Sequence, residues 1–303
     1  MLMLNTELQI GLASPIVILL PHKKDGWEKD AGVDELREIT LAAESLGYYS
    51  LTCSEHVGIP TEVAAVRGGR YYDPVATFSY MAAITQNIKF LTHIAVLPYH
   101  HPLEVAKRFG TMDKLSKGRL ILGIGVGSLK EEFDLLGAEF ELRGVSYSDS
   151  MKAVKASFGK RLPVYEGEFY KFDDFIIDPY ADQKNLPLWL GGRTLRSLRR
   201  AIEDGDGWAP FALTLEQTAE MIEKARQLDA WEKREKCFDI SLGLEIKEDL
   251  TKGGDFDAVK WRLEASIEAG GTHFNVSPES ISLQHYLDQI AVFSDKIMPD
   301  FVN

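Results

Sequence analysis

One pair of residues in this 303-residue chain stands out because its side chains could transfer a proton. Glu55 and His56 follow an apolar run that ends at Cys53, so a carboxylate and an imidazole stand just after an expected strand. An imidazole titrates near neutral pH and can exchange a proton with a bound substrate. We therefore expect His56 and Glu55 to be catalytic, although a lone histidine at the start of a loop is more often structural.

Glycine-rich segments follow two other apolar runs and point to a binding function. Gly125–Ser128 and Gly191–Thr194 each end a run and precede a helix, where free backbone N–H groups bind anions. Thr194 can cap its helix, and Arg193 adds positive charge. A dinucleotide fingerprint would need a third glycine where Ser128 stands. We expect an anionic cofactor to bind here; the alternatives are plain tight turns and an ordinary helix cap beside a solvated arginine.

A repeated unit of amphipathic helix and short apolar strand must position these residues. The expected strands are Gln9–Ala13, Tyr48–Cys53, Ile88–Val96, Leu120–Ile124, Leu186–Leu190, Gly207–Phe211, Phe238–Ile246 and Thr272–Val276. The expected helices are Val33–Leu46, Asp73–Ile84, Pro102–Leu115, Val145–Phe158, Ser197–Asp204, Leu215–Leu228, Asp255–Ala269 and Ser282–Asp295. This alternation predicts an α/β fold, a closed (β/α)8 TIM barrel, with function at the carboxyl ends of its strands. Glu166–Asp178 alternates apolar and polar residues and predicts a small inserted β-hairpin.

Composition and charge narrow the class of protein. No linker-like stretch divides the chain, so residues 1–303 are expected to form one domain. The net charge of −12 argues against nucleic acid or an anionic membrane surface as partner. No signal peptide or long apolar run is evident, so we expect a soluble cytoplasmic protein. Cys53 and Cys237 are too few for a disulfide framework, and no metal site is expected.

Several other polar residues near the expected strand ends have less specific interpretations. Glu131 and Glu132 are interpreted as solvated acids in the first turn of a helix, where they support its dipole; the alternative is that one of them faces the pocket. His100 and His101 precede a helix that begins with proline, so a role in starting that helix is favoured over lining the mouth of the barrel. His93 is expected to pack or to contact a cofactor ring rather than to transfer a proton.

The order of several motifs resembles the bacterial luciferase-like monooxygenase superfamily, in its branch of coenzyme F420-dependent oxidoreductases. The motifs are LAAESLGYYSLTCSEH (41–56), YYDPVATFSYMAAIT (71–85), HHPLEVAKRFGTMDKLSKGRLILGIGVGSLKEEFDLLG (100–137), EGEFYKFDDF (166–175) and PLWLGGRTLRSLRRAIEDGDGW (187–208). The similarity extends over nearly the whole chain and is clearest from Gln9 to Phe211.

The resemblance implies a barrel that binds a flavin or deazaflavin across its strand ends, with Glu55-His56 beside the ring. Deazaflavin enzymes often carry Asp-His at this point, and Glu-His is commoner among luciferase-type flavin enzymes. A non-prolyl cis peptide bond is implied at or next to His93-Ile94. The residues expected to bind the cofactor are Thr92, His93, Gly125, Val126, Gly127, Ser128, Gly191, Gly192, Arg193 and Thr194.

The implied activity is hydride transfer between coenzyme F420 and a small organic substrate. One alternative is a two-component monooxygenase that receives reduced FMN from a separate reductase and activates oxygen. Another is a flavin-binding barrel without catalytic activity. An aldolase or hydrolase barrel is disfavoured, because the sequence shows no evident lysine at a strand end and no His/Asp metal cluster. A homodimer is expected, as in most of the superfamily.

Overall fold

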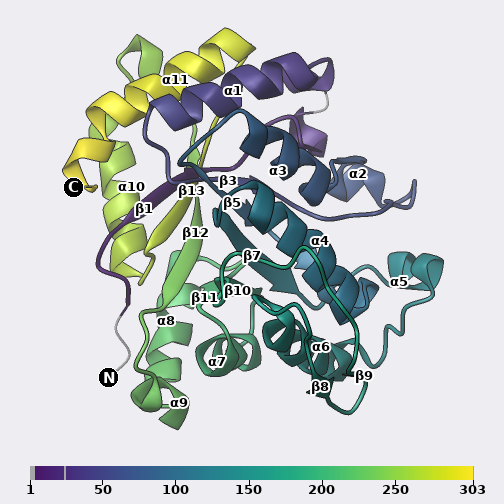
Figure 1. Cartoon of the computed structure of the whole chain (residues 1–303). Coiled ribbons are helices and arrows are strands. Elements are labelled where there is room, and N and C mark those ends of the chain that lie inside the picture. The colour runs from purple at the N-terminus through teal and green to yellow at the C-terminus, as the bar shows by residue number, and fades with distance from the viewer. Residues whose placement is uncertain (1–3, 24, 303) are drawn as a thin grey trace.

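Eight parallel strands form a closed barrel surrounded by helices in the computed structural model, which describes residues 4–23 and 25–302 (Figure 1). In chain order the strands are β1 (Gln9–Leu12), β3 (Ser50–Cys53), β5 (Lys89–Thr92), β7 (Leu120–Gly125), β10 (Leu188–Gly191), β11 (Gly207–Ala209), β12 (Asp239–Ile246) and β13 (His273–Pro278). Neighbouring strands pair in the order β10-β11-β12-β13-β1-β3-β5-β7, and β7 pairs with β10 to close the ring. The expected barrel is confirmed.

The eight expected helices are all present, with small shifts at their ends. They are α1 (Val33–Ser45), α3 (Pro74–Ala83), α4 (Pro102–Leu115), α6 (Arg143–Ser157), α7 (Leu195–Asp204), α8 (Leu215–Arg226), α10 (Phe256–Glu268) and α11 (Leu283–Lys296). Side-chain caps fix several starts: Asp73 accepts from the third residue of α3, and Thr214 does the same for α8. Three shorter helices are α2 (Ala64–Arg67), α5 (Lys130–Leu136) and α9 (Asp229–Lys233). Figure 1 shows α2 and α5 on the same side of the barrel.

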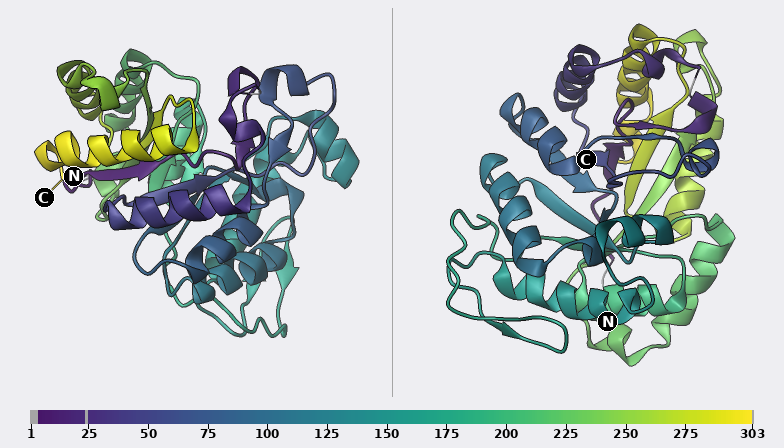
Figure 2. Two further views of the ribbon diagram at one scale, coloured as in Figure 1. Left: turned by 90° about the horizontal axis from the view of Figure 1, so that it is seen from above. Right: turned by 90° about the vertical axis from the view of Figure 1, so that its right-hand side faces the viewer.

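Two sequence expectations need correction. The single strand expected at Ile88–Val96 is divided into β5 and a short β6 (Ala95–Val96), which pairs with the end of β7. The inserted hairpin consists of β8 (Tyr165–Glu166) and β9 (Lys171–Phe172), so its strands end earlier than expected. The expected continuation to Asp178 fails because Asp174 adopts a positive φ of 56°, which ends the extended backbone. Figure 2 shows this hairpin on the outside of the barrel.

A second antiparallel pair, absent from the sequence expectations, joins two long connections. Strand β2 (Ile18–Leu19), which follows β1, pairs with β4 (Arg70–Tyr71), which precedes α3. Each strand has only two residues, too few for period-two alternation to be recognised in the sequence. The pairing links the chain segments that follow the first two barrel strands.

Large side chains fill the inside of the barrel and close it below the strand ends. Leu91, Ile121 and Trp189 are buried together on the inner face, with Tyr49 packed against them. The ring of His273 lies 4.9 Å from the ring of Trp189 and 5.8 Å from that of Tyr49. Because this plug fills the barrel, a ligand can approach only from an end of the strands.

The described residues lack two further kinds of feature. None of their helices has both the length and the apolar character needed to cross a membrane. No group of three or more His, Cys, Asp or Glu side chains among them could hold a metal ion. Cys53 is buried and Cys237 is exposed, and both are free thiols.

Candidate functional site at the carboxyl ends of the strands

A bulge between β5 and β6 lies at the mouth of the barrel. The His93-Ile94 peptide bond is cis, which confirms the position implied by the resemblance. The side chain of Ile94 lies against glycines of β7 and β10. A Cβ atom at Gly125 would come within 1.8 Å of Ile94 Cδ1, and one at Gly191 within 3.1 Å. The absence of side chains at Gly125 and Gly191 therefore makes room for Ile94.

The two residues before Ile94 are held differently. Thr92 is fully buried, and its Oγ1 donates a hydrogen bond to the carbonyl oxygen of Gly123 at 2.7 Å. The backbone N–H of His93 donates to the carbonyl oxygen of Cys53 at 2.8 Å. Burial lowers the pKa of His93, so its ring is neutral, and its buried Nε2 has no hydrogen-bond partner within the described chain. Thr92 thus fixes the backbone, whereas His93 keeps an unpaired nitrogen at the bulge.

Glu55 braces the bulge from the end of β3. Its side chain is 5% exposed, and Oε2 accepts a hydrogen bond from the backbone N–H of Val96 at 2.7 Å. Its other oxygen, Oε1, lies 2.8 Å from Nε2 of His100. The backbone N–H of Glu55 donates to the carbonyl oxygen of Ile94 at 3.1 Å. Both carboxylate oxygens are therefore engaged with other groups, and neither contacts His56.

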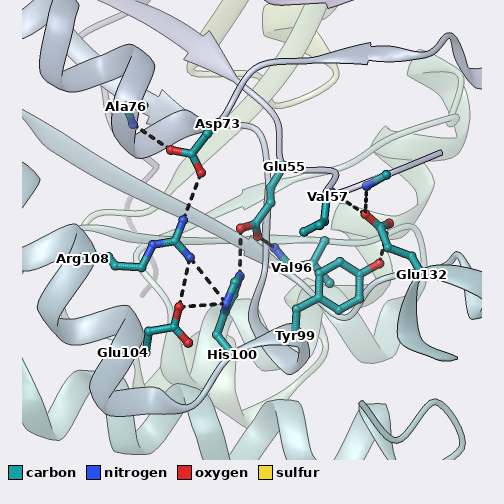
Figure 3. Close-up of polar contacts among 11 residues, drawn as sticks. Glu55, Val57, Asp73, Ala76, Val96, Tyr99, His100, Glu104, Arg108 and Glu132 are labelled. Atoms are coloured by element: carbon teal, nitrogen blue, oxygen red, sulfur yellow. Dashed lines mark hydrogen bonds and ion pairs between the residues drawn. The ribbon is translucent and has the colours of Figure 1, made fainter. Parts of the chain in front are cut away.

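A chain of charged side chains continues from His100 towards the surface (Figure 3). His100 Nδ1 lies 3.5 Å from Glu104 Oε1, and Arg108 donates to the same oxygen at 3.4 Å. Arg108 also donates to Asp73 at 3.0 Å, and Asp73 caps α3. Burial alone would lower the pKa of His100, but the hydrogen bond to Glu55 and the neighbouring carboxylates raise it above its usual range. The contacts of His100 therefore join the bulge to α4 and, through Arg108 and Asp73, to α3.

His56, next to Glu55 in sequence, has a different carboxylate partner. Its Nδ1 lies 2.8 Å from Glu132 Oε2, and Tyr99 donates its hydroxyl hydrogen to the same oxygen at 2.8 Å. The backbone N–H groups of Val57 and Gly58 donate to Oε1 of Glu132. Figure 3 shows Glu132 turned towards Val57 and Tyr99. Four donors therefore surround one carboxylate.

The position of Glu132 corrects a sequence expectation. Glu131 is exposed, as expected, but Glu132 is 1% exposed and faces the protein. A signal for this was present: Glu132 stands three residues after the buried Leu129 and before the buried Phe133, so it shares their side of the helical turn. Sequence reasoning missed it because acids in a first helical turn are usually solvated.

The electrostatics of this cluster determine which nitrogen of His56 is free. Burial would raise the pKa of Glu132, but the hydrogen bonds from His56 and Tyr99 outweigh it and hold that pKa below its usual range. An ionised Glu132 only accepts hydrogen bonds, so Nδ1 of His56 carries a hydrogen. Nε2 of His56 has no hydrogen-bond partner among the described residues, and the side chain is 17% exposed. It is thus available for proton exchange.

Tyrosine side chains complete the surroundings of His56. Burial and the hydrogen bond to Glu132 raise the pKa of Tyr99, so it remains a protonated donor. The ring of Tyr71 lies 4.5 Å from the imidazole ring at an interplanar angle of 67°. Tyr71 is the last residue of β4 and pairs with Ile18 of β2, so this two-stranded ribbon places an aromatic ring beside the imidazole.

The ends of β7 and β10 lie side by side, as the barrel requires. Leu190 pairs with Ile124 in parallel register, which brings Gly125–Ser128 next to Gly191–Thr194. Thr194 caps α7, because its side chain accepts from the backbone N–H of Ser197 at 3.2 Å. This confirms the expected cap. Of the glycine segment after β7, Val126 and Gly127 are half-buried and Ser128 is exposed.

Gly192 has a reason within the protein for lacking a side chain. Its φ is 149°, and a Cβ atom there would lie 2.4 Å from Cβ of Ser197. A larger residue at this position would therefore disturb the start of α7 whether or not a ligand is bound. A change at Gly192 consequently cannot separate cofactor binding from folding.

Two arginines and several free N–H groups surround this rim. Arg193 is exposed, with its guanidinium 5.5 Å from the ring centre of Phe211. Arg67 of α2 donates a hydrogen bond to Oγ of Ser128 at 3.1 Å. This contact could not be predicted from the sequence, because the two residues lie 61 positions apart. Within the described ranges, the backbone N–H groups of Gly127, Ser128 and Arg193 have no acceptor. This combination suits an anionic group.

The wall opposite these elements is open. On β12 the outward residues are buried, whereas Gly243 and Glu245, which alternate with them, are exposed. By this alternation Gly243 and Glu245 lie on the face of β12 opposite the buried one, which is the inner face of the barrel, and the Glu245 side chain is 78% exposed. A Cβ atom at Gly243 would have no atom within 4 Å. The mouth of the barrel therefore has free space on its inner face.

Comparisons with known proteins agree with this architecture. The family model of the luciferase-like monooxygenases matches residues 14–246. An uncharacterised protein of Mycobacterium tuberculosis, Rv0940c, is 24% identical over 277 residues, which cover 86% of this chain and 93% of that protein.

Solved structures with the same fold include proteins that use two different cofactors. The coenzyme F420-dependent tetrahydromethanopterin reductase of Methanopyrus kandleri has a TM-score of 0.71 at 18% identity, over 97% of this chain and 99% of that one. The oxygenating constituent of 3,6-diketocamphane monooxygenase from Pseudomonas putida, solved with FMN, has a TM-score of 0.72 at 15% identity, over 98% and 99%. The matched family model extends over most of the barrel, and the chain belongs to the luciferase-like monooxygenase family.

Proposed function

We propose that this protein is an oxidoreductase that transfers a hydride between coenzyme F420 and a small organic substrate, with His56 as the proton partner. The observation that carries the proposal is the His56–Glu132 contact of 2.8 Å, which engages Nδ1 and leaves Nε2 free. Hydride transfer to or from a carbonyl carbon moves a proton at the oxygen, so a positioned acid–base group is required. His56 meets this requirement.

The residues at the mouth fit a deazaflavin or flavin with an anionic tail. Thr92 and His93 would lie at the ring, next to the bulge. Gly125, Val126, Gly127, Ser128, Gly191, Gly192, Arg193 and Thr194 would hold the tail, with Arg67 as an addition from α2. The free N–H groups of this rim support the assignment, because they provide donors without side-chain rearrangement. When bound, such a cofactor supplies the hydride or accepts it.

The protein's own side chains have distinct parts in this proposal. His56 Nε2 takes the proton of a substrate hydroxyl during oxidation and returns it during reduction. Glu132 holds Nδ1 of His56 and fixes the ring, and the raised pKa of Tyr99 keeps it a donor to Glu132. Glu55, first expected to be catalytic with His56, is assigned here to hold the bulge, because its two oxygens contact Val96 and His100.

A second candidate is the oxygenase component of a two-component monooxygenase, which would use reduced FMN from a separate reductase. The Glu55-His56 sequence favours it, because Glu-His is commoner than Asp-His among luciferase-type flavin enzymes. The barrel shared with an FMN-containing monooxygenase is compatible with either chemistry. A flavin-binding barrel without turnover is the remaining alternative.

Titration of the purified protein with coenzyme F420 and with FMN, followed by tryptophan fluorescence, tests the choice of cofactor. Oxygen consumption with each reduced cofactor then separates hydride transfer from oxygenation, because a deazaflavin lacks the ring nitrogen that oxygen activation uses. Saturable F420 binding without oxygen uptake is the expected result. Tight FMN binding with oxygen uptake would favour the second candidate. We also propose a homodimer, which light scattering at micromolar concentration would test.

A further inference from the structure

A line of hydrogen bonds crosses the inside of the barrel just above its plug. Nε2 of His273 lies 2.9 Å from Oγ of Ser50, and its Nδ1 lies 2.9 Å from Oγ of Ser241. Oγ of Ser241 also accepts a hydrogen bond from the side-chain amide nitrogen of Asn275 at 3.0 Å. These four side chains come from β3, β12 and β13, and all are buried.

The neutral state of His273 limits the roles of its two neighbours. Burial lowers the pKa of His273 to about 3, so the ring is neutral and has one donor and one acceptor nitrogen. Because the amide nitrogen of Asn275 donates to Oγ of Ser241, the hydroxyl hydrogen of Ser241 is free to be donated to Nδ1 of His273. Nε2 then carries the ring hydrogen and donates to Ser50.

The other end of the Asn275 amide has no partner. Asn275 is 5% exposed, and its Oδ1 is buried without a hydrogen bond to any described residue. An unpaired buried acceptor is unfavourable and calls for a reason. Asn275 pairs in register with Gly243, beside which there is open space at the mouth. The carboxylate of Glu245 is exposed two residues further along the same inner face.

The strand that carries Asn275 lies across the barrel from the bulge and the glycine rim. Four steps along the pairing order separate β13 from β7, and four separate β12 from β5, so these strands stand opposite each other in the eight-stranded barrel. The bulge and the glycine rim occupy β5, β7 and β10. A planar cofactor bound on that side would leave β12 and β13 as the wall that faces it. A second molecule that reached such a cofactor would then lie against this opposite wall.

We propose that Asn275 Oδ1 and Glu245 form a substrate subsite that selects a hydroxyl or amine group. Asn275 supplies a fixed neutral acceptor, and Glu245 supplies a carboxylate nearer to solvent. The substrate is then an alcohol or an amine whose hydrogen-bond donor enters the mouth of the barrel first. This inference rests on the proposed function only in that the substrate reaches a cofactor held on the opposite wall.

A matched pair of probe ligands tests the subsite without any cofactor. Cyclohexanol carries a hydroxyl donor, and its methyl ether, methoxycyclohexane, has similar bulk but no donor. Ligand-detected NMR titration of the cofactor-free protein should give a dissociation constant about fivefold lower for the alcohol. Asn275→Leu should remove this preference and Asn275→Asp should retain it. Gln9→Leu is the matched control, because Gln9 is also buried with an unpaired oxygen, but at the amino end of β1.

The outcomes are distinct for the subsite and for the proposed function. Equal binding of alcohol and ether by the natural protein would overturn the subsite, and this arm does not depend on the folding of any variant. A preference that survives Asn275→Leu would also overturn it. Titration of Asn275→Leu with F420 and with FMN should match the natural protein. A tenfold loss of cofactor affinity would instead assign Asn275 to the cofactor. Failure of the protein to bind either cofactor would contradict the proposed function and leave the alcohol preference unaffected.

Discussion

Glu55 and Glu132 are both buried glutamates that contact a histidine at the mouth of the barrel, yet their surroundings differ in one respect. Glu55 accepts from a backbone N–H of the bulge and from His100, whose second nitrogen faces Glu104. Glu132 accepts from four donors around His56 and leaves the second nitrogen of that ring free. In the first cluster both ring nitrogens of the histidine have partners, whereas in the second Nε2 of His56 has no hydrogen-bond partner within the described part of the chain.

The comparison shows that neighbours in sequence can belong to separate networks. The end of β3 directs the side chain of Glu55 behind the bulge and that of His56 towards α5. The pair that looks like a catalytic dyad in the sequence is therefore divided, and the acid that orients the imidazole comes from a helix 76 positions later. The two clusters should respond differently when each carboxylate or imidazole is altered.

The largest expected effect is on turnover when the open nitrogen is removed. His56→Gln should lower kcat by about a hundredfold or more, the usual scale for loss of a general acid–base group. The binding constant for the cofactor should change little, because His56 is assigned to proton transfer. Steady-state kinetics and a fluorescence titration of the same variant measure both quantities. Unchanged turnover would remove His56 from the mechanism.

A smaller loss of turnover should follow when the orienting carboxylate is neutralised. Glu132→Gln keeps the shape but removes the ionised acceptor that holds Nδ1 of His56. We therefore expect kcat to fall about tenfold. In the double variant with His56→Gln, the change at Glu132 should have almost no additional effect, because the two residues act as a unit. Independent, multiplicative losses would show that Glu132 acts elsewhere.

Changes in the cluster of Glu55 and His100 should affect stability rather than turnover. Glu55→Gln should lower the free energy of unfolding by about 1–3 kcal/mol, because a buried acceptor for His100 and Val96 is weakened. Glu104→Gln is the matched control: its side chain is 50% exposed, and exposed ion pairs contribute about 0–1 kcal/mol. Urea unfolding of both variants measures the difference. An equal loss in the two variants would contradict a bracing role for Glu55.

The two clusters should also give opposite pH dependences of stability. The pKa of Glu132 is lowered on folding, so its stabilisation is present above the unfolded pKa of about 4.3 and is lost as the pH falls through the folded value. The pKa of His100 is raised, so its stabilisation is complete below about pH 6.5 and is lost as the pH rises through the folded value. Unfolding curves from pH 3 to 9 for Glu132→Gln and His100→Gln should therefore diverge from the natural protein at opposite ends.

The smallest effect is expected at the rim, outside both clusters. Arg193→Ala should weaken cofactor binding by about 1 kcal/mol, because an exposed charge-assisted contact is screened by water and salt. Arg196→Ala, an exposed change at the second residue of α7, is the control. Titrations at low and high salt should show the Arg193 effect shrinking as salt rises. A salt-independent effect would indicate an indirect change in the loop.

Much of the architecture could be predicted from local patterns. The alternation of helices and apolar strands was sufficient to predict the barrel, and the glycine segments marked the ends of β7 and β10. Those patterns are local in sequence, whereas the contacts that define the site join residues that are far apart in sequence. Glu132 could have been suspected from Leu129 and Phe133, but its partners His56 and Tyr99 could not, because they depend on how three connections meet. The hydrogen bond between Arg67 and Ser128 could not be predicted for the same reason.

The glycines illustrate a second limit of sequence interpretation. A pattern of alternating glycines predicts room near the backbone, but it does not say which group uses that room. At Gly125 and Gly191 the neighbour is Ile94, and at Gly192 it is Ser197. The anion-binding hypothesis for this rim therefore depends on the free N–H groups rather than on the glycines themselves.

The packing of Ile94 between Gly125 and Gly191 also has a consequence for variation and redesign. Ile94 of the bulge and two glycines from neighbouring strands share one small volume, so a methyl group added at 125 must be removed at 94. Substitutions at these positions are expected to arise as compensating sets in homologues and in selected libraries, with a small residue at 94 accompanying alanine or serine at 125. Because Ile94 stands at the bulge, such exchanges would change the depth of the mouth while the barrel itself is preserved.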